Sequence, residues 1–282
     1  MKTFLSIFLL FFSYSLDAQN CCRDFKSKAN QGVTVIAHRG ASGTAPENTL
    51  PAVRKAVEMN VDFVEIDIHL SKDGKVVVIH DATLDRTTNG SGNVNDFTLE
   101  ELRKLNADFT FTEQDFNATI PTLEEVIEEI GNKAFLLLEI KKGKNEYYQG
   151  IEEKAIKVLQ EKNYTDRVIM QTFYDEIIKN WRAIDKDMPV HKLMLGNIRP
   201  LPIYIDHKIR WGSPYRKIGK LENVTGMNVN VNFATTRNIK KMKAKGYSTY
   251  VWTVNHEESM KRLKDKKADG IITNFPEKLL GL

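Results

Sequence analysis

Three carboxylates stand in short apolar runs of the sequence, at positions that suit the binding of a hard divalent cation. Glu65 and Asp67 alternate with isoleucines, so on a strand both carboxylates would lie on one face. Glu139 ends the apolar run that starts at Phe135. Carboxylates side by side in a barrel interior raise each other's pKa unless a cation lies between them. Three of them from adjacent strands are the ligands that Ca²⁺ or Mg²⁺ prefers.

Two histidines and two basic residues accompany these carboxylates. His38 and Arg39 end the first apolar run, His80 ends another, and Lys141 lies two residues after Glu139 on the same predicted face. Two imidazoles with an ordinary pKa of about 6.5 can divide proton acceptance and proton donation. The two basic side chains can neutralise the negative charge of an anionic ligand.

Each of these features alone also has a structural explanation. A single histidine at a strand end usually makes a structural hydrogen bond, a Glu-x-Asp pair is common on exposed sheet faces, and Lys141 could simply neutralise Glu139. The complete set is harder to explain without a ligand. Burying it without a metal or an anion would cost several kcal/mol for each unpaired ion, so the set predicts a functional site.

The elements that must position this site alternate along the chain. Short runs rich in β-forming residues are separated by amphipathic stretches, which is typical of βαβ units and a parallel sheet. The predicted strands are Thr34–His38, Phe63–His69, Phe135–Ile140, Val168–Phe173, His191–Leu195, Met227–Val231, Tyr247–Val254 and Gly270–Thr273. The predicted helices between them are Thr49–Asn60, Ile120–Ile130, Tyr147–Lys162, Asp175–Ile184, Thr235–Lys245 and Glu257–Lys267. Eight such strands predict an α/β fold, a (β/α)8 TIM barrel, with catalytic residues at the C-terminal strand ends.

Two segments depart from this repeating pattern. Lys75–His80 is β-like but follows the second strand after a short turn containing Asp73 and Gly74, which is a hairpin signal. A parallel return needs about a dozen residues, so we expect an antiparallel hairpin that opens an insertion over about residues 70–118, with a short helix at Leu99–Leu105. Residues 196–224, rich in proline and aromatic residues, form a second irregular insertion.

The first nineteen residues have the layout of a secretory signal peptide. Lys2 precedes an apolar run, Phe4–Phe12, and small and polar residues lead to Ala18. A bilayer-spanning helix needs about 20 apolar residues, so we expect no transmembrane segment in the mature chain and export to the periplasm or the medium. An uncleaved N-terminal anchor is the alternative. Residues 20–30 are predicted to be a flexible tail before one domain over residues 31–282.

The composition is ordinary for a soluble globular protein, and the cysteine count excludes a disulfide framework for its body. Cys21 and Cys22 are the only cysteines, and lipid modification of Cys21 is a minority alternative because the preceding residues are a poor lipoprotein signal. The net charge of +4 arises from 41 basic and 37 acidic residues, so the balance does not predict nucleic-acid binding. The lysine-rich run Lys240–Lys245 is interpreted as the solvated face of a helix.

Several motifs resemble the glycerophosphodiester phosphodiesterase family in order and spacing. They are Ala37-His38-Arg39-Gly40, Pro46-Glu47-Asn48-Thr49, Val64-Glu65-Ile66-Asp67, Lys72-Asp73-Gly74, Val78-Ile79-His80-Asp81, Leu138-Glu139-Ile140-Lys141, Gln171-Thr172-Phe173, Val251-Trp252-Thr253-Val254-Asn255 and Asp269-Gly270-Ile271-Ile272-Thr273-Asn274. The match runs from about residue 34 to residue 276. Thr172 stands where the family often has serine, and this change keeps the hydroxyl. Residues 196–224 are longer than the family's connection at this place, so the resemblance does not define the pocket for the leaving group.

The resemblance implies a role for each matching residue. His38 and His80 match the general acid and base, and Glu65, Asp67 and Glu139 match the ligands of a divalent metal ion, Ca²⁺ or Mg²⁺. Arg39 and Lys141 match phosphate-holding positions, and Trp252 matches the aromatic that packs on glycerol. Glu47 and Asn48 match the substrate-binding motif that flanks the first histidine, where Asn48 would orient a catalytic group.

The implied activity is metal-dependent hydrolysis of a small glycerophosphodiester to sn-glycerol 3-phosphate and an alcohol. The attacking oxygen would be water or a neighbouring glycerol hydroxyl, and the sequence does not decide between them. Two alternatives stay open. One is a related phosphodiesterase that acts on lysophospholipids or sugar phosphodiesters, and the other is a non-catalytic exported binding protein.

Overall fold

The computed structural model describes residues 32–111, 116–195 and 223–282. The predicted signal peptide, the tail over residues 20–30 with both cysteines, and nearly all of the second insertion lie outside the described residues. Within the described part of the chain, no helix is long and apolar enough to cross a membrane.

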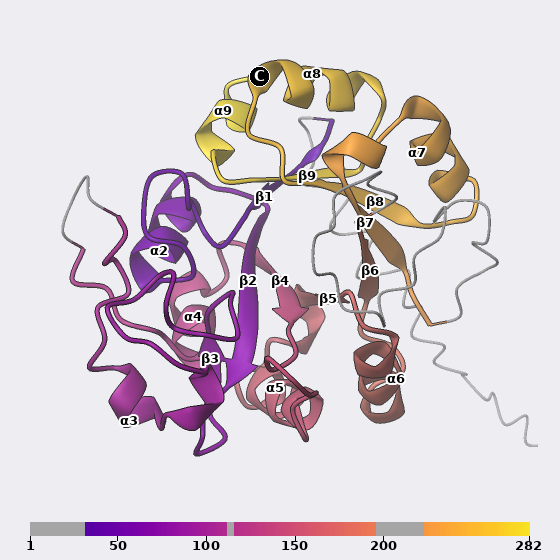
Figure 1. The fold of residues 1–282 in the computed structure, drawn as a ribbon. Helices are drawn as coiled ribbons and strands as arrows, with labels where there is room; N and C mark the ends of the chain where they lie inside the picture. Colours follow the sequence, from indigo (N-terminus) through magenta and orange to yellow (C-terminus); the bar gives the residue numbers. More distant parts are fainter. Residues whose placement is uncertain (1–31, 112–115, 196–222) are drawn as a thin grey trace, which may run out of the picture.

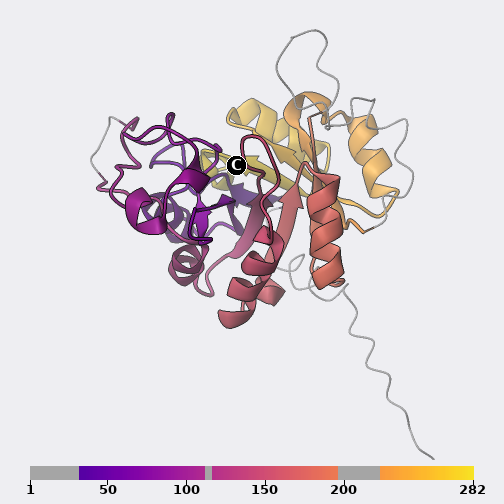
Figure 2. The same ribbon diagram turned by 60° about the horizontal axis from the view of Figure 1, so that its bottom comes forward.

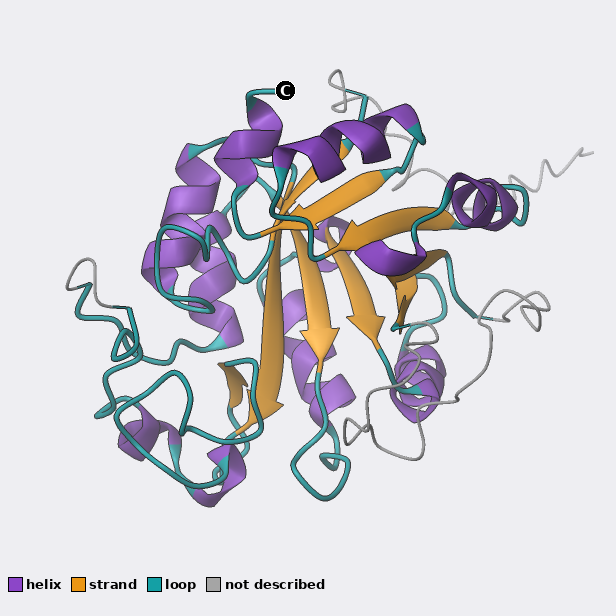
Figure 3. Ribbon diagram, turned by 45° about the horizontal axis from the view of Figure 1, so that its top comes forward, coloured by secondary structure: helices purple, strands orange, loops and turns teal. Residues whose placement is uncertain are grey.

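Eight parallel strands close into a barrel, which confirms the predicted fold (Figures 1 and 3). The strands are β1 (Thr34–Ala37), β2 (Phe63–Leu70), β4 (Phe135–Ile140), β5 (Val168–Thr172), β6 (Val190–Met194), β7 (Gly226–Asn230), β8 (Ser248–Trp252) and β9 (Gly270–Thr273). Each strand pairs with the next in this order, and β1 pairs with both β9 and β2, so the sheet closes on itself.

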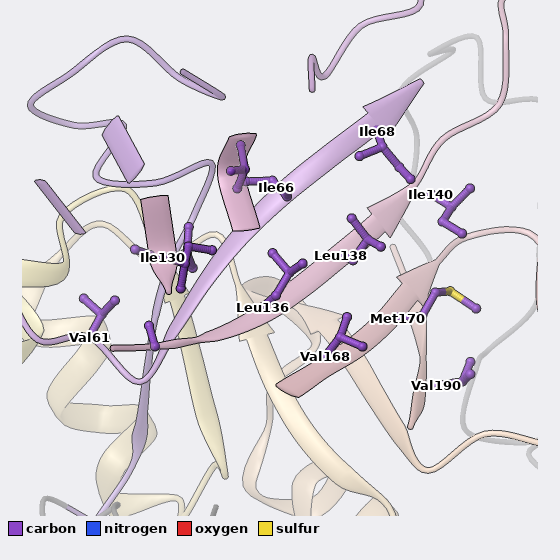
Figure 4. Packing of buried hydrophobic residues seen from close by; sticks show 14 of the residues in the cluster. Val61, Ile66, Ile68, Ile130, Leu136, Leu138, Ile140, Val168, Met170 and Val190 are labelled. Carbon is purple, nitrogen blue, oxygen red and sulfur yellow. The ribbon is translucent and has the colours of Figure 1, made fainter. Parts of the chain in front are cut away.

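Helices surround the barrel and follow most of the strands. They are α2 (Leu50–Glu58), α4 (Leu123–Ile130), α5 (Ile151–Glu161), α6 (Asp175–Ile184), α7 (Thr236–Lys243), α8 (Glu257–Asp265) and α9 (Pro276–Leu280). The outward side chains of the strands pack against the helices in one large apolar core, part of which Figure 4 shows around Ile66, Leu136 and Leu138.

A second, smaller apolar cluster forms the floor inside the barrel. Each member is an inward-facing residue of a different strand, and the members are Ile36, Phe63, Leu137, Ile169, Tyr250 and Ile272. Because side chains alternate along a strand, the residues two positions further on face the same interior. Glu65 follows Phe63 in this way and Glu139 follows Leu137, so the carboxylates lie on the barrel interior, one step toward the C-terminal strand ends.

The predicted antiparallel return is also confirmed. The strand β3 (Val76–Val78) pairs with β2 through Ile68↔Val78 and lies outside the barrel order. The insertion that it opens contains η1 (Val94–Asp96) and α3 (Leu99–Leu102) and lies on the side of the barrel away from α6 and α7 (Figures 1 and 2). It packs on a small core of its own, made of Val77, Ile79, Leu84, Val94, Leu102, Ala107, Ala118 and Ile120.

Three predicted helix bounds were wrong by more than two residues. The helix predicted over Tyr147–Lys162 begins at Ile151, because Gly150 adopts a φ of 72° at the N-cap and breaks the turn before it. The helix predicted from Ile120 begins at Leu123, because Thr122 is an extended N-cap whose side chain accepts the backbone N–H of Glu125. The short helix predicted to end at Leu105 ends at Leu102, and α9 was not predicted at all.

Candidate active site

The three predicted metal-ligand carboxylates converge in the barrel. Glu65, Asp67 and Glu139 are all buried, and each offers one oxygen within 4.8 Å of the others. Asp67 and Glu139 stand side by side in the register of β2 and β4. The predicted grouping is therefore observed, and its cause is the two-residue alternation on two adjacent strands.

Two basic side chains lie among these carboxylates. Lys141 Nζ donates to Glu139 and lies 2.9 Å from Asp67 Oδ1, an oxygen that is buried without a hydrogen bond of good geometry. Arg39 Nε lies 3.4 Å from Asp67 Oδ2, and the backbone N–H of Arg39 donates to Glu65 Oε2 at 2.9 Å. Three carboxylates thus lie close to only two positively charged side chains, Arg39 and Lys141. A set of carboxylate oxygens with more carboxylates than basic partners fits a hard divalent ion.

The charges in the trio perturb one another strongly. Burial, together with the nearby carboxylates, raises the pKa of Glu65, and burial raises the pKa of Glu139 despite the adjacent Lys141. Burial also acts to raise the pKa of Asp67, but Lys141, His80 and Arg39 outweigh it and hold that pKa well below its usual range. Carboxylates whose ionised form is disfavoured by burial and mutual repulsion gain from a bound cation.

The two predicted proton-transfer histidines lie beside this trio, each held through Nδ1. His38 is the first residue after β1; its Nδ1 lies 2.6 Å from Asn274 Oδ1 and its Nε2 lies 3.9 Å from Glu65 Oε2. Burial lowers the pKa of His38 to about 3, and the charge of Arg39 adds to this, so the ring is neutral at pH 7.

His80 follows β3, at the start of the insertion. Its Nδ1 lies 2.6 Å from Asp81 Oδ1, and Arg86 holds the other oxygen of Asp81. With Nδ1 donating to the carboxylate, Nε2 is the nitrogen that faces the chemistry. The nearby charge of His80 acts to lower the pKa of both His38 and Asp67, so the three side chains interact electrostatically.

Three further residues were predicted to contact substrate, and the structure gives two of them protein partners. Asn48 Nδ2 donates to Asp67 Oδ2 at 2.9 Å and its Oδ1 accepts the Asp67 backbone N–H, so this side chain orients Asp67. Glu47 accepts hydrogen bonds from Arg39 and Arg86. Trp252, at the end of β8, packs edge-on against Phe173 at 5.7 Å between ring centroids, and its buried Nε1 has no hydrogen-bond partner within the described residues.

The backbone at the site adopts sparsely populated conformations. Arg39 and Asn48 have φ values of 55° and 58°, in the left-handed region that few side chains favour. Gly40 follows at 76°, and a Cβ there would lie 2.6 Å from the backbone carbon of Ala52. Such strained positions persist where the surrounding contacts hold them, and they cluster at functional sites.

Sequence reasoning missed His69, the next inward residue after Asp67. His69 Nε2 lies 3.1 Å from the carbonyl oxygen of His80, and Nδ1 lies 2.8 Å from the hydroxyl of Tyr148. Burial lowers the pKa of His69 to about 4, so the neutral ring donates through Nε2 and accepts the tyrosine proton at Nδ1. His69 therefore fixes the main chain that carries His80, and the strand alternation was the signal that could have found it.

Comparison with known proteins places these residues in a family context. The model of the "Glycerophosphoryl diester phosphodiesterase family" matches residues 38–278. The chain is 41% identical over 250 residues to a glycerophosphodiester phosphodiesterase of Caldanaerobacter subterraneus, with 88% of this chain and 96% of that protein covered. It is 29% identical over 270 residues to human glycerophosphodiester phosphodiesterase 1, covering 89% and 80% of the two chains.

A solved phosphodiesterase structure has a similar fold. An Oleispira antarctica phosphodiesterase in complex with the product sn-glycerol-3-phosphate superposes with a TM-score of 0.74 at 28% identity, covering 88% of this chain and 95% of that one.

Proposed function

Because the chain belongs to the glycerophosphoryl diester phosphodiesterase family, we propose that it hydrolyses small glycerophosphodiesters to sn-glycerol 3-phosphate and an alcohol in a metal-dependent reaction. The observation that carries this proposal is the convergence of Glu65, Asp67 and Glu139 with Arg39 and Lys141 in the barrel interior. The product complex of the Oleispira phosphodiesterase supports the choice of substrate class.

The charged residues of the site would hold the phosphodiester. The guanidinium of Arg39 and the ammonium of Lys141 bind its non-bridging oxygens and stabilise the charge that develops on them. Glu65, Asp67 and Glu139 would hold the divalent ion, which would supply further positive charge to stabilise the phosphodiester. Asn48 keeps Asp67 oriented during the reaction, since it bonds both the carboxylate and the backbone of that residue.

The two histidines would divide the proton transfers. His38 is neutral at pH 7, so its Nε2 can accept the proton of the attacking oxygen, while Asn274 holds its Nδ1. His80, oriented by Asp81, donates a proton to the leaving alcohol oxygen as the phosphorus–oxygen bond breaks. Attack by water gives sn-glycerol 3-phosphate directly. Attack by the neighbouring glycerol hydroxyl would first give a cyclic phosphate, which water must then open in a second step, with the histidine that donated a proton in the first step now accepting one. Detection of a cyclic phosphate intermediate would select attack by the hydroxyl.

The test is hydrolysis of glycerophosphocholine by the purified protein, before and after treatment with chelator and after adding back Ca²⁺ or Mg²⁺. We expect the chelator to abolish activity, one of the two ions to restore it, and His38→Ala and His80→Ala to lower kcat by roughly 10²–10⁴-fold. Replacement of the exposed His256 by alanine is the matched control. Full activity in either active-site variant, or in the chelated enzyme, would refute the scheme. Faster cleavage of lysophospholipids than of glycerophosphocholine would favour the related phosphodiesterase instead.

We also propose that residues 1–19 direct export and are then removed. The support is the sequence layout, with Lys2 before the apolar run Phe4–Phe12. Fractionation of cells that produce the full chain, followed by N-terminal sequencing of the product, tests it. A full-length protein retained in the cytoplasm would contradict export, and loss of membrane association in Cys21→Ala would reveal lipid anchoring.

A further inference from the structure

A chain of polar side chains crosses the barrel interior and ends on Glu65. His191 Nδ1 lies 2.9 Å from Asn228 Oδ1, Asn228 Nδ2 donates to Gln171 Oε1 at 2.7 Å, and Gln171 Nε2 donates to Glu65 Oε1 at 3.0 Å. The four residues come from β6, β7, β5 and β2. None is more than 2% exposed, so water does not compete for these bonds.

The hydrogen bonds of this chain have one consistent direction. Since the amide nitrogen of Asn228 is used on Gln171, its oxygen must accept from His191, which therefore carries its proton on Nδ1. Burial lowers the pKa of His191 to about 4, so at pH 7 the ring holds only that proton. Each donor in the chain therefore points toward Glu65, and Glu65 Oε1 accepts the last hydrogen bond.

The fold makes room for this chain above the apolar floor. Gln171 follows Ile169 by two residues on the inward face of β5. A Cβ at Gly226 would lie 2.3 Å from His191 Nε2, so the absence of a side chain there admits the imidazole ring. Tyr250 packs against the same ring at 4.8 Å between centroids. An apolar interior usually rejects uncompensated amides, and here the oxygen and the nitrogen of both amide side chains have hydrogen-bond partners.

We propose that His191, Asn228 and Gln171 are positioning residues that fix the Glu65 carboxylate for cation binding. Gln171 occupies one lone pair of Oε1, and the backbone N–H of Arg39 occupies one of Oε2, so the carboxylate is held from both sides. These bonds hold the carboxylate in the orientation that brings one of its oxygens within 4.8 Å of an oxygen of Asp67 and of Glu139. The inference rests on the proposed metal site. Hydrogen-bonded partners of ligating carboxylates typically account for about 10–100-fold in metal affinity.

The test measures cation binding without substrate. Asn228→Leu breaks the chain in the middle and Gln171→Met removes the bond to Glu65; both keep the net charge and approximate size. Thr249→Val on β8 is the matched control, because Thr249 is fully buried and its hydroxyl makes no hydrogen bond within the described residues. Calorimetric titration of chelator-treated protein with Ca²⁺ and with Mg²⁺ gives Kd, and urea unfolding in chelator gives the metal-free stability.

We expect both chain variants to bind the cation about 10–100-fold more weakly than the wild type, and the control to bind it with the wild-type Kd. Wild-type affinity in folded Asn228→Leu and Gln171→Met, with only their metal-free stability lowered, would overturn the proposal and leave the chain a structural element. If Asn228→Leu does not fold, Gln171→Met decides the question alone. A wild-type protein that binds neither cation would instead refute the metal site on which the inference rests.

Discussion

Acidification from pH 7 to pH 5 should weaken the fold through the buried imidazole of His191. Burial lowers the pKa of His191 to about 4, whereas the unfolded chain has the ordinary value of about 6.5. Between these two values the unfolded state binds the proton and the folded state does not. The stability from His191 is therefore fully present above about pH 6.5 and is lost as the pH falls toward 4. The linkage relation gives a loss of about 2 kcal/mol from this one residue between pH 7 and pH 5.

Urea unfolding of the wild type and of His191→Phe, at both pH values and in chelator, isolates this contribution. Phenylalanine keeps a ring against Tyr250 in the space over Gly226 but cannot titrate. Loss of the bond to Asn228 lowers the stability of the variant at both pH values, so only the difference between pH 7 and pH 5 is compared. The other buried histidines contribute equally to both proteins and cancel.

We expect the wild type to lose about 2 kcal/mol more than His191→Phe on acidification. His256→Gln, at an exposed position, controls for removal of a histidine as such. An equal pH 7 to pH 5 difference in the wild type and His191→Phe would refute the reasoning. It would mean that the folded ring takes up a proton as readily as the ring in the unfolded chain, so that burial does not keep His191 neutral.

Three further outcomes follow from single contacts. Lys141→Met removes the cation shared by Asp67 and Glu139, so urea unfolding in chelator should show a loss of about 3 kcal/mol, and an unchanged value would contradict the ion pairing. Asn274→Ala removes the partner of His38 Nδ1; a lost hydrogen bond of about 1 kcal/mol should lower kcat roughly fivefold, with no change in cation affinity. Thr122→Ala removes the capping box of α4 and should cost about 1 kcal/mol of stability at unchanged kcat.

The barrel and its carboxylate cluster could be predicted because both depend on periodicities that are written in the sequence. Alternation on β2 places Glu65 and Asp67 on one face, and the apolar run before Glu139 predicts a buried neighbouring strand. The Asp73-Gly74 turn predicts the antiparallel hairpin, since so short a connection cannot return a parallel strand. The helix start at Ile151 was missed because its cause is the left-handed φ of Gly150, which the apolar pattern does not report.

The supporting contacts could not be predicted because they depend on which strands become neighbours. The chain from His191 to Glu65 needs β5, β6 and β7 to lie side by side in the barrel and needs a residue without a side chain at Gly226. Strand alternation identifies His69 as an inward residue, but its partner is the backbone carbonyl of His80, and no residue pattern identifies such a partner. Asn274 lies 236 residues from His38 and meets it only because β9 closes the barrel onto β1.

The site draws its parts from two separate cores, and its geometry depends on how these are joined. The barrel floor supports the carboxylates, whereas the small core of the insertion supports the segment after His80. Glu47 joins them, since one carboxylate accepts from Arg39 beside β1 and from Arg86 in the insertion. His69 joins them a second time, through its bond to the His80 carbonyl. Two independent contacts thus fix the position of the proposed proton donor relative to Arg39 and β2, although it lies outside the barrel strands.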